Sequence, residues 1–530
     1  MSKGSFASAA GVMVVGIFVS RILGLVREGV IAAQFGQGQI ASIYKMAFRP
    51  ADLLYYIVAG GALYSAFIPV FTEYLRTDRE EEAWKVFSVV TSVMGMVVLV
   101  LILIGEIFTR QLVPLVAWGF DAGELDMMAS LTRILLPAQF FFFIGGLTMG
   151  TLQARGVFAI PAMGPPIYNL GIIAGGVLLA GPFGIAGLCI GALAGAFAGN
   201  FLLQVLYSVR IGIRYRFSLD VKHPGVRKVF ALMLPVLLGL SLPQVDVVIN
   251  SAFATLLNDP GAVAALDNGN RLMQVPLGIF GQAAGIAALP TLSALFAQRN
   301  WKEYRETVSF GVRSVFFATI PASVFMIIAA KPIIAFILQA GSYGPDDTAQ
   351  AAIALVYYCI GVFAWGGQAI VARAFYAMQD TVTPIVIGTI MTFLFVPLNW
   401  LLMKPLGHGG LALATSVMAI MHMLALSKVL ASRVEGIGAW RIVSSTLRIC
   451  AASGLAAIPA AALIWYFGGA SIAGPALSVK KAALLQLLPS FAAYLIAYAG
   501  LCRLLKVEEL TPFASLLRRR FTRGAPTPGD

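Results

Sequence analysis

A small set of basic residues lies inside apolar segments of this 530-residue chain, where a charge needs a specific reason. The set includes Arg21, Arg27, Lys45, Arg49 and Arg271. A cation in hydrocarbon is energetically costly, so such a side chain must face a water-filled cavity or a charged partner. Guanidinium groups keep their charge at any accessible pH and bind phosphate oxygens through two parallel N–H bonds. The pattern therefore predicts a wet cavity for an anion with several oxygens.

Acidic residues beside these cations leave a second interpretation open. Glu28 follows Arg27 directly, and Asp52 lies three residues after Arg49. Each arginine could therefore be a structural residue that is paired with a local acid.

Four oxygen-bearing residues form a candidate site for a sodium ion or a proton. Asp246 and Asn250 lie one helical turn apart, and Asp380 and Thr383 lie at a turn further along the chain. Hard cations prefer carboxylate, amide and hydroxyl oxygens. The alternative is an acid that is simply wetted by the cavity. Apart from this candidate ion, we expect no cofactor and no metal site.

The composition identifies the elements that must position these residues. Hydrophobic residues make up 59% of the chain and charged residues only 12%, about half the share in soluble proteins. Long continuous apolar runs favour an all-α membrane protein over a β-barrel. Fourteen transmembrane helices are predicted near 6–34, 40–72, 84–109, 125–152, 159–181, 185–209, 229–256, 265–297, 303–329, 347–377, 383–403, 409–431, 441–467 and 482–505.

The loops between these segments orient the chain. With the N-terminus in the cytoplasm, 23 basic residues fall on the cytoplasmic side and 5 on the opposite side. By the positive-inside rule, both termini are cytoplasmic. The net charge of +13 is thus mainly a topology signal, and no nucleic-acid partner is expected. The run Arg518-Arg519-Arg520 is expected to lie against anionic membrane lipids.

An internal repeat relates the two halves at an offset of 223 residues. The run Pro182-x-Gly184-x-x-Gly187-Leu188 matches Pro405-x-Gly407-x-x-Gly410-Leu411, and Arg49 meets Arg271 after a one-residue slip. Two pseudo-symmetric six-helix lobes with a central site are typical of transporters that rock between two states. The predicted parts are 1–215 (first lobe), 222–433 (second lobe), 440–506 (two extra helices) and 507–530 (basic cytoplasmic tail).

Enzyme chemistry has no support in the sequence. The three histidines, His223, His408 and His422, fit neither a metal-ligand nor a catalytic-triad pattern, and no phosphate-binding loop for ATP is present. We therefore expect a transporter and not an enzyme.

Several motifs resemble the MurJ (MviN) lipid II flippases of the multidrug/oligosaccharidyl-lipid/polysaccharide (MOP) exporter superfamily. The first is Ser20-Arg21-Ile22-Leu23-Gly24-Leu25-Val26-Arg27-Glu28, followed by Phe35-Gly36. The others are Ala66-Phe67-Ile68-Pro69 with Glu73-Tyr74, Ile160-Pro161-Ala162 with Pro165 and Asn169, Asn270-Arg271-Leu272-Met273 with Pro276 and Gly278, Leu289-Pro290, and Phe375-Tyr376 with Gln379-Asp380 and Thr383-Pro384. They run in order through the first twelve predicted helices.

The resemblance implies a flippase for the undecaprenyl-diphosphate-linked peptidoglycan precursor, in the bacterial cytoplasmic membrane. It implies a cationic cavity for the headgroup and a groove along the last two helices for the lipid tail. The family's cavity residues carry over to Arg21, Arg27, Glu28, Arg49 and Arg271. Lipid II, membrane lipids and cell-wall synthesis proteins are the implied partners.

Three positions depart from the family pattern. Ser42 stands where many members have aspartate, Tyr55 where they have arginine, and Gly60 where an acid is frequent. Alternative functions are therefore a flippase for another polyprenyl-linked saccharide, a cation-coupled MOP exporter, or a membrane scaffold that does not transport.

Overall fold

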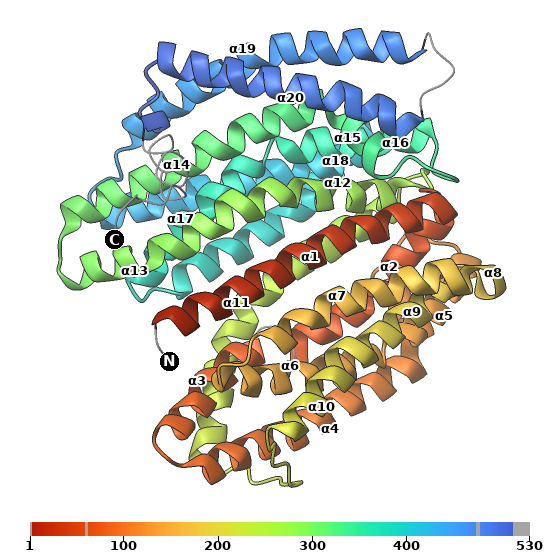
Figure 1. The fold of residues 1–530 in the computed structure, drawn as a ribbon, viewed down its shortest axis with the longest axis vertical. Coiled ribbons are helices and arrows are strands. Elements are labelled where there is room, and N and C mark those ends of the chain that lie inside the picture. Colours follow the sequence, from red (N-terminus) through yellow and green to blue (C-terminus); the bar gives the residue numbers. More distant parts are fainter. Residues whose placement is uncertain (1–2, 59–61, 473–477, 512–530) are drawn as a thin grey trace, which may run out of the picture. The chain divides into compact units, whose positions relative to one another are not determined.

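The computed structural model describes residues 3–58, 62–472 and 478–511, and every regular element in these ranges is a helix (Figure 1). Gly60 and residues 512–530, which make up most of the predicted basic tail, lie outside the described residues. The first elements are α1 (Lys3–Phe35), α2 (Gln39–Val58), α3 (Ala62–Arg76), α4 (Glu80–Leu112), α5 (Ala122–Leu135), α6 (Ala138–Ala154), α7 (Ala159–Ala174), α8 (Ala180–Phe183), α9 (Ala186–Gly195), α10 (Leu203–Arg210) and α11 (Pro224–Thr255).

The remaining helices complete the chain. They are α12 (Ala262–Pro276), α13 (Ala283–Ala297), α14 (Trp301–Ile328), α15 (Ala330–Ile337), α16 (Pro345–Cys359), α17 (Val362–Ala377), α18 (Val382–Arg433), α19 (Ala439–Ile472) and α20 (Val479–Leu504). Short 3₁₀ or π-helical turns join some of them, at Val113–Leu115, Gly175–Leu179, Ala196–Leu202 and Leu277–Gln282.

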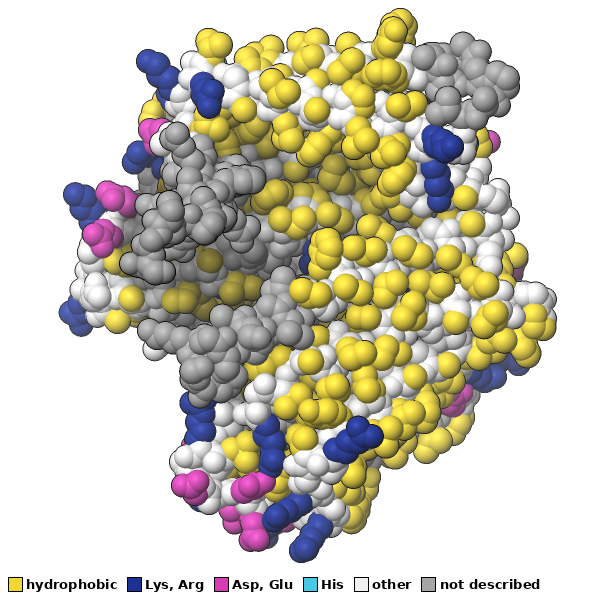
Figure 2. All heavy atoms as spheres, viewed as in Figure 1, with side chains coloured by type: hydrophobic (Ala, Val, Ile, Leu, Met, Phe, Trp, Pro, Cys, Tyr) yellow, Lys and Arg dark blue, Asp and Glu magenta, His cyan; other side chains and the backbone are white. Residues whose placement is uncertain are grey.

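Each predicted span coincides with one helix or with consecutive helices. Within the described ranges, nine helical stretches are long and apolar enough to cross a membrane, and the bent pair α16–α17 could make a tenth. One of the nine is the 52-residue α18, which covers two predicted spans. Hydrophobic side chains cover much of the face in Figure 2, and Lys and Arg side chains appear mostly toward its margins. The chain is thus a multi-pass α-helical membrane protein.

The expected loop between residues 403 and 409 is reduced to a single break in α18. Gly407 there has φ 56° and ψ −136°, and its repeat equivalent Gly184 has φ 55° and ψ −139°. Only glycine adopts this conformation readily, because it lacks a Cβ. The two halves therefore break their helices in the same way at equivalent positions, in agreement with the repeat.

The described residues form two compact units. The first lies within Met1–Ala264 and Ala340–Asp347, and the second lies within Ala265–Gln339 and the described part of Thr348–Asp530. This division differs from the expected lobes because α11, the first helix of the second repeat, packs in the first unit against α3 and α2. An ion pair of 2.7 Å between Lys228 Nζ on α11 and Glu73 Oε2 on α3 adds to that packing.

Close helix contacts in the first unit depend on glycine. A Cβ on Gly171 of α7 would lie 2.6 Å from the carbonyl oxygen of Gly191 on α9, and one on Gly191 would lie 2.3 Å from that of Gly171. Small residues let the backbones of membrane helices approach this closely. On its other side α7 packs along α1 (Figure 1), which fixes the helix that carries Arg21 and Arg27.

In the second unit, α14, α17, α18, α19 and α20 share a core of buried apolar side chains that includes Tyr304, Phe375 and Tyr494. Helices α19 and α20 lie alongside each other (Figure 1). Since α14 packs against α17 and α19, the two C-terminal helices are attached to the repeat through this core.

Candidate cationic site

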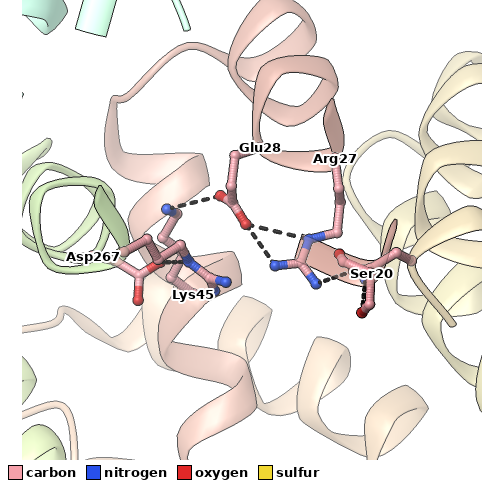
Figure 3. Close-up of polar contacts among 7 residues, drawn as sticks. Ser20, Arg27, Glu28, Lys45 and Asp267 are labelled. Carbon is pink, nitrogen blue, oxygen red and sulfur yellow. Dashed lines mark hydrogen bonds and ion pairs between the residues drawn. The ribbon is translucent and has the colours of Figure 1, made fainter. Parts of the chain in front are cut away.

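Arg27, Glu28 and Lys45 form a charged group in the interior of the first unit. Glu28 on α1 lies between the two cations (Figure 3): its Oε1 is 2.7 Å from Arg27 Nη2, and its Oε2 is 3.3 Å from Lys45 Nζ on α2. The side chains are only 13%, 6% and 6% exposed, in the order Arg27, Glu28, Lys45. Charges removed from water need such partners. Two cations therefore share the one carboxylate of Glu28.

Asn169 on α7 holds Arg27 from the other side. Arg27 Nη1 donates to Asn169 Oδ1 at 2.9 Å, while Asn169 Nδ2 donates to the backbone oxygen of Ser20 at 3.1 Å and to its Oγ at 3.2 Å. The close contact of α1 with α7 makes these bonds possible, since a Cβ on Gly16 would lie only 2.7 Å from that of Ala162. The amide thereby orients the guanidinium toward Glu28.

Arg49 lies one turn after Lys45 on α2 and is partly buried. Residues four apart share a helix face, so Arg49 extends the positive face of α2.

Arg21 behaves differently. It is exposed, and no hydrogen bond or ion pair joins it to Arg27, Glu28 or Lys45 within the described ranges. Six residues on a helix correspond to a turn of about 240°, so Arg21 and Arg27 point in different directions.

Arg271 belongs to the second unit, on α12. Its Nε is 2.7 Å from Asp267 Oδ2, one turn earlier on the same helix, and the arginine side chain is 44% exposed. The Asp267 side chain is only 12% exposed, so the pair is half in water on the arginine side and largely buried on the carboxylate side. The convergence of Arg271 with Arg27 and Arg49, expected from the repeat, stays a prediction.

The candidate cation residues occupy two separate settings. Asp246 and Asn250 lie on α11 in the first unit, whereas Asp380 and Thr383 lie at the start of α18 in the second. Asp380 accepts hydrogen bonds from the Thr383 backbone N–H at 2.9 Å and from its hydroxyl at 2.6 Å, and it pairs with Arg433. Burial opposes ionisation, but these hydrogen bonds and Arg433 lower the pKa of Asp380 overall. A cation at Asp380 would have to replace Arg433.

Two of the three departures from the family pattern lie in well-packed positions. Ser42 is 1% exposed, and its hydroxyl donates to the Pro260 carbonyl at 2.6 Å. Tyr55 packs edge-on against Phe142, with ring centroids 5.9 Å apart. Both residues therefore make uncharged contacts where charge is frequent in the family.

The sequence interpretation included Lys45 among the intramembrane cations but not in the binding set, and it gave Asn169 no role. Lys45 is as buried as Glu28 and shares its carboxylate. A polar amide inside an apolar span was the available signal for Asn169, because buried polar groups need partners. The partner of the Asn169 amide depends on how α7 packs against α1, because Arg27 lies 142 residues away in the chain.

Comparison with known proteins gives consistent matches. A family profile described as "Lipid II flippase MurJ" matches residues 31–477. A probable lipid II flippase MurJ from Vibrio cholerae is 30% identical over 459 residues, which is 84% of this chain and 86% of the relative. The lipid II flippase MurJ of Burkholderia cenocepacia is 29% identical and covers 77% of this chain and 80% of its own length.

Solved structures show the same fold. A lipid II flippase MurJ in an inward closed conformation aligns with a TM-score of 0.75 and 24% identity, covering 93% of this chain and 98% of its own. An inward-facing multidrug resistance MATE transporter of the MOP superfamily aligns with a TM-score of 0.64 and 14% identity, covering 80% and 98%.

Proposed function

Because the chain belongs to the lipid II flippase MurJ family, we propose that it moves lipid II across the bacterial cytoplasmic membrane. The observation that carries the proposal is the buried Arg27–Glu28–Lys45 group, in which Arg27 and Glu28 are residues that the resemblance assigns to the family's cationic cavity. The diphosphate of a lipid-linked precursor is the anion that this chemistry fits.

Arg27, Arg49 and Arg271 are the proposed diphosphate ligands, with Arg21 at the edge of the site and Glu28 as a competing anion. In the absence of substrate, Glu28 compensates Arg27 and Lys45. When the diphosphate enters, its oxygens take over part of the hydrogen bonding of Arg27 and displace Asp267 from Arg271. When it leaves, the two carboxylates return to their arginines. The lobes close on one side of the membrane as they open on the other, as in other two-lobed transporters.

The proposal also covers the topology, the coupling ion and the partners. The basic residues of the loops support cytoplasmic termini. Asp246 and Asn250 are the proposed residues for a coupling sodium ion or proton. The chain is proposed to act as a transporter without enzyme activity or a cofactor, with membrane lipids and cell-wall synthesis proteins as partners.

Complementation of a bacterial strain depleted of its own lipid II flippase tests the function. The unaltered chain should restore growth and relieve precursor accumulation. Arg27→Ala and Arg271→Ala should each abolish rescue at normal protein levels. Arg110→Ala is the control, because Arg110 is 66% exposed and pairs with the exposed Asp126 at 3.0 Å. Full rescue by both cavity variants would refute the proposed diphosphate site.

Failure of the unaltered chain itself, despite correct membrane insertion, would refute the lipid II assignment. It would favour another polyprenyl-linked cargo or a scaffold. Accumulation of a different lipid-linked saccharide in a strain that lacks this chain would then identify the cargo.

A further inference from the structure

A second charged pocket lies in the second unit, apart from the cationic site. Its volume is about 330 Å³, and it lies between α14, the first turns of α19 and the segment after α20. Its lining consists of Arg313, Trp440, Arg441, Ser444, Ser445, Arg448, Val507, Glu508 and Glu509. Arg313 and Arg448 lie within predicted membrane spans, where a charge indicates function by default.

The floor of the pocket is a buried ion pair. Arg313 on α14 is 5% exposed and pairs with Glu509, which is 3% exposed. Arg313 Nη1 is also 3.1 Å from Glu508 Oε2, and the Ser445 hydroxyl donates to Glu509 Oε2 at 3.0 Å. These bonds attach the segment after α20 to α14 and α19, so the pocket has a fixed base.

The charges of the pocket do not cancel. Arg441 Nη2 lies 2.8 Å from Glu508 Oε2, and its hydrogen bond helps to hold the pKa of Glu508 below the usual range. Arg313 and Arg441 thus share the carboxylates of Glu508 and Glu509. Arg448 donates instead to the backbone carbonyl of Lys506 at 3.2 Å, and within the described ranges it has no acidic partner. Three guanidinium groups face two carboxylates, which leaves one positive charge uncompensated.

Exposed apolar side chains lie next to the pocket on α19. Trp440, which lines the pocket, is 81% exposed, and Val443 (48%) and Leu447 (63%) are the chain neighbours of the lining residues Ser444 and Arg448. Tryptophan is enriched at membrane–water interfaces, where its ring reaches the headgroup level. An occupant is therefore expected to combine one negative charge with aliphatic chains.

We propose that this pocket binds the phosphodiester of an anionic phospholipid. Arg448 and the N–H groups that Arg441 does not use for Glu508 bind the phosphate oxygens, and Ser444 lies beside them. The acyl chains lie along Trp440, Val443 and Leu447. With the termini in the cytoplasm, as proposed above, the lipid belongs to the inner leaflet.

The chain's own terminus is a poorer occupant. Residues 512–530 contain four arginines and one aspartate, so their net charge has the same sign as that of the pocket. A volume of about 330 Å³ corresponds to roughly ten water molecules at liquid density, which leaves room for a phosphodiester.

Lipid binding by the purified full-length chain tests the proposal. Native mass spectrometry would follow titration with phosphatidylglycerol and, separately, with uncharged phosphatidylcholine. One phosphatidylglycerol should bind with clear preference. Since a basic residue near a membrane surface contributes about a factor of five in binding of anionic lipid, Arg448→Gln should weaken that binding about fivefold. Ser444→Asp should weaken it at least as much, by adding a negative charge at the mouth.

Two controls accompany these variants. Arg503→Gln removes the same charge from an exposed position near the end of α20 that does not line the pocket, so it should bind like the unaltered chain. Arg448→Lys keeps the charge and should retain most of the binding. Circular dichroism and a monodisperse elution profile check that each variant is folded.

Three outcomes would overturn the proposal. They are equal binding of the two lipids, full phosphatidylglycerol binding by both Arg448→Gln and Ser444→Asp, and displacement of the lipid by millimolar glycerol phosphate. The last outcome would indicate a site for a soluble anion. None of these results depends on transport, so they leave the proposed flippase function untouched.

Discussion

Glu28→Gln is the substitution that separates the two roles of the charged group on α1 and α2. The side chain keeps its size and one oxygen acceptor but loses the charge that compensates Arg27 and Lys45. Glu28 is 5% exposed, so solvent replaces little of that charge. Removal of one partner from a buried ion pair costs about 3–5 kcal/mol. We therefore expect the substrate-free protein to be less stable by about 3 kcal/mol.

Binding of the diphosphate should change in the opposite direction. For a phosphate roughly 6 Å from the carboxylate and an effective dielectric constant of about 20, the repulsion is about 3 kcal/mol. Without Glu28, a diphosphate should bind about 100-fold more tightly. Release should slow correspondingly, so Glu28→Gln should complement poorly although it binds lipid II well.

Two measurements on the purified protein check this prediction: thermal unfolding without substrate and lipid II titration by native mass spectrometry. Glu73→Gln is the matched control. Glu73 also pairs with a cation, Lys228, but it is 48% exposed, so water replaces most of the interaction and its loss should leave stability nearly unchanged. Unchanged stability together with unchanged or weaker lipid II binding by Glu28→Gln would refute the competing-anion role of Glu28.

Three further predictions concern the fold around the sites. Gly407→Ala should destabilise the protein by about 1–3 kcal/mol in thermal unfolding, because φ 56° with ψ −136° strains an alanine, whereas Gly454→Ala, in an open helical position, should not. Ser42→Ala should cost about 1 kcal/mol in the same assay by removing the hydrogen bond to Pro260, and Ser42→Asp should cost more because its carboxylate would face that carbonyl oxygen. The pKa of Asp380 is lower in the folded state than in the unfolded state. The ionised carboxylate therefore stabilises the fold above the unfolded pKa of about 3.9, and this stabilisation is lost as the pH falls through the folded pKa. In a series of melting temperatures measured at different pH values, Asp380→Asn should show a smaller loss of stability on the acid side.

Local patterns in the sequence were sufficient for the membrane class and for the helical segments. Hydropathy depends only on neighbouring residues, and a segment in hydrocarbon must satisfy its own backbone, so apolar runs become helices. The repeat was equally accessible. Gly184 and Gly407, at the same offset as their neighbouring prolines, break their helices with nearly identical dihedral angles.

The predicted helix boundaries were less accurate where a single residue interrupts a helix. The predicted loop before residue 409 is a helix that continues to Gly407, and α15 (Ala330–Ile337) was not predicted at all. The compact unit that ends at Ala264 includes α11 because this helix packs against α3 and α2, and such packing is not encoded in hydropathy.

Pairing of charges was decided by tertiary structure. The sequence placed Arg27 beside Glu28, but only the packing of α1 on α7 brings Asn169 to the same guanidinium. The fold likewise places Arg433, 53 residues away in the chain, against the candidate cation ligand Asp380. Arg313 acquires Glu509 from 196 residues away. Composition and periodicity act over one or two helical turns, and they determined that this chain spans a membrane and carries cations there. Which groups neutralise a given charge depends on which side chains the packed helices bring within about 4 Å of it. Only the tertiary structure decides this.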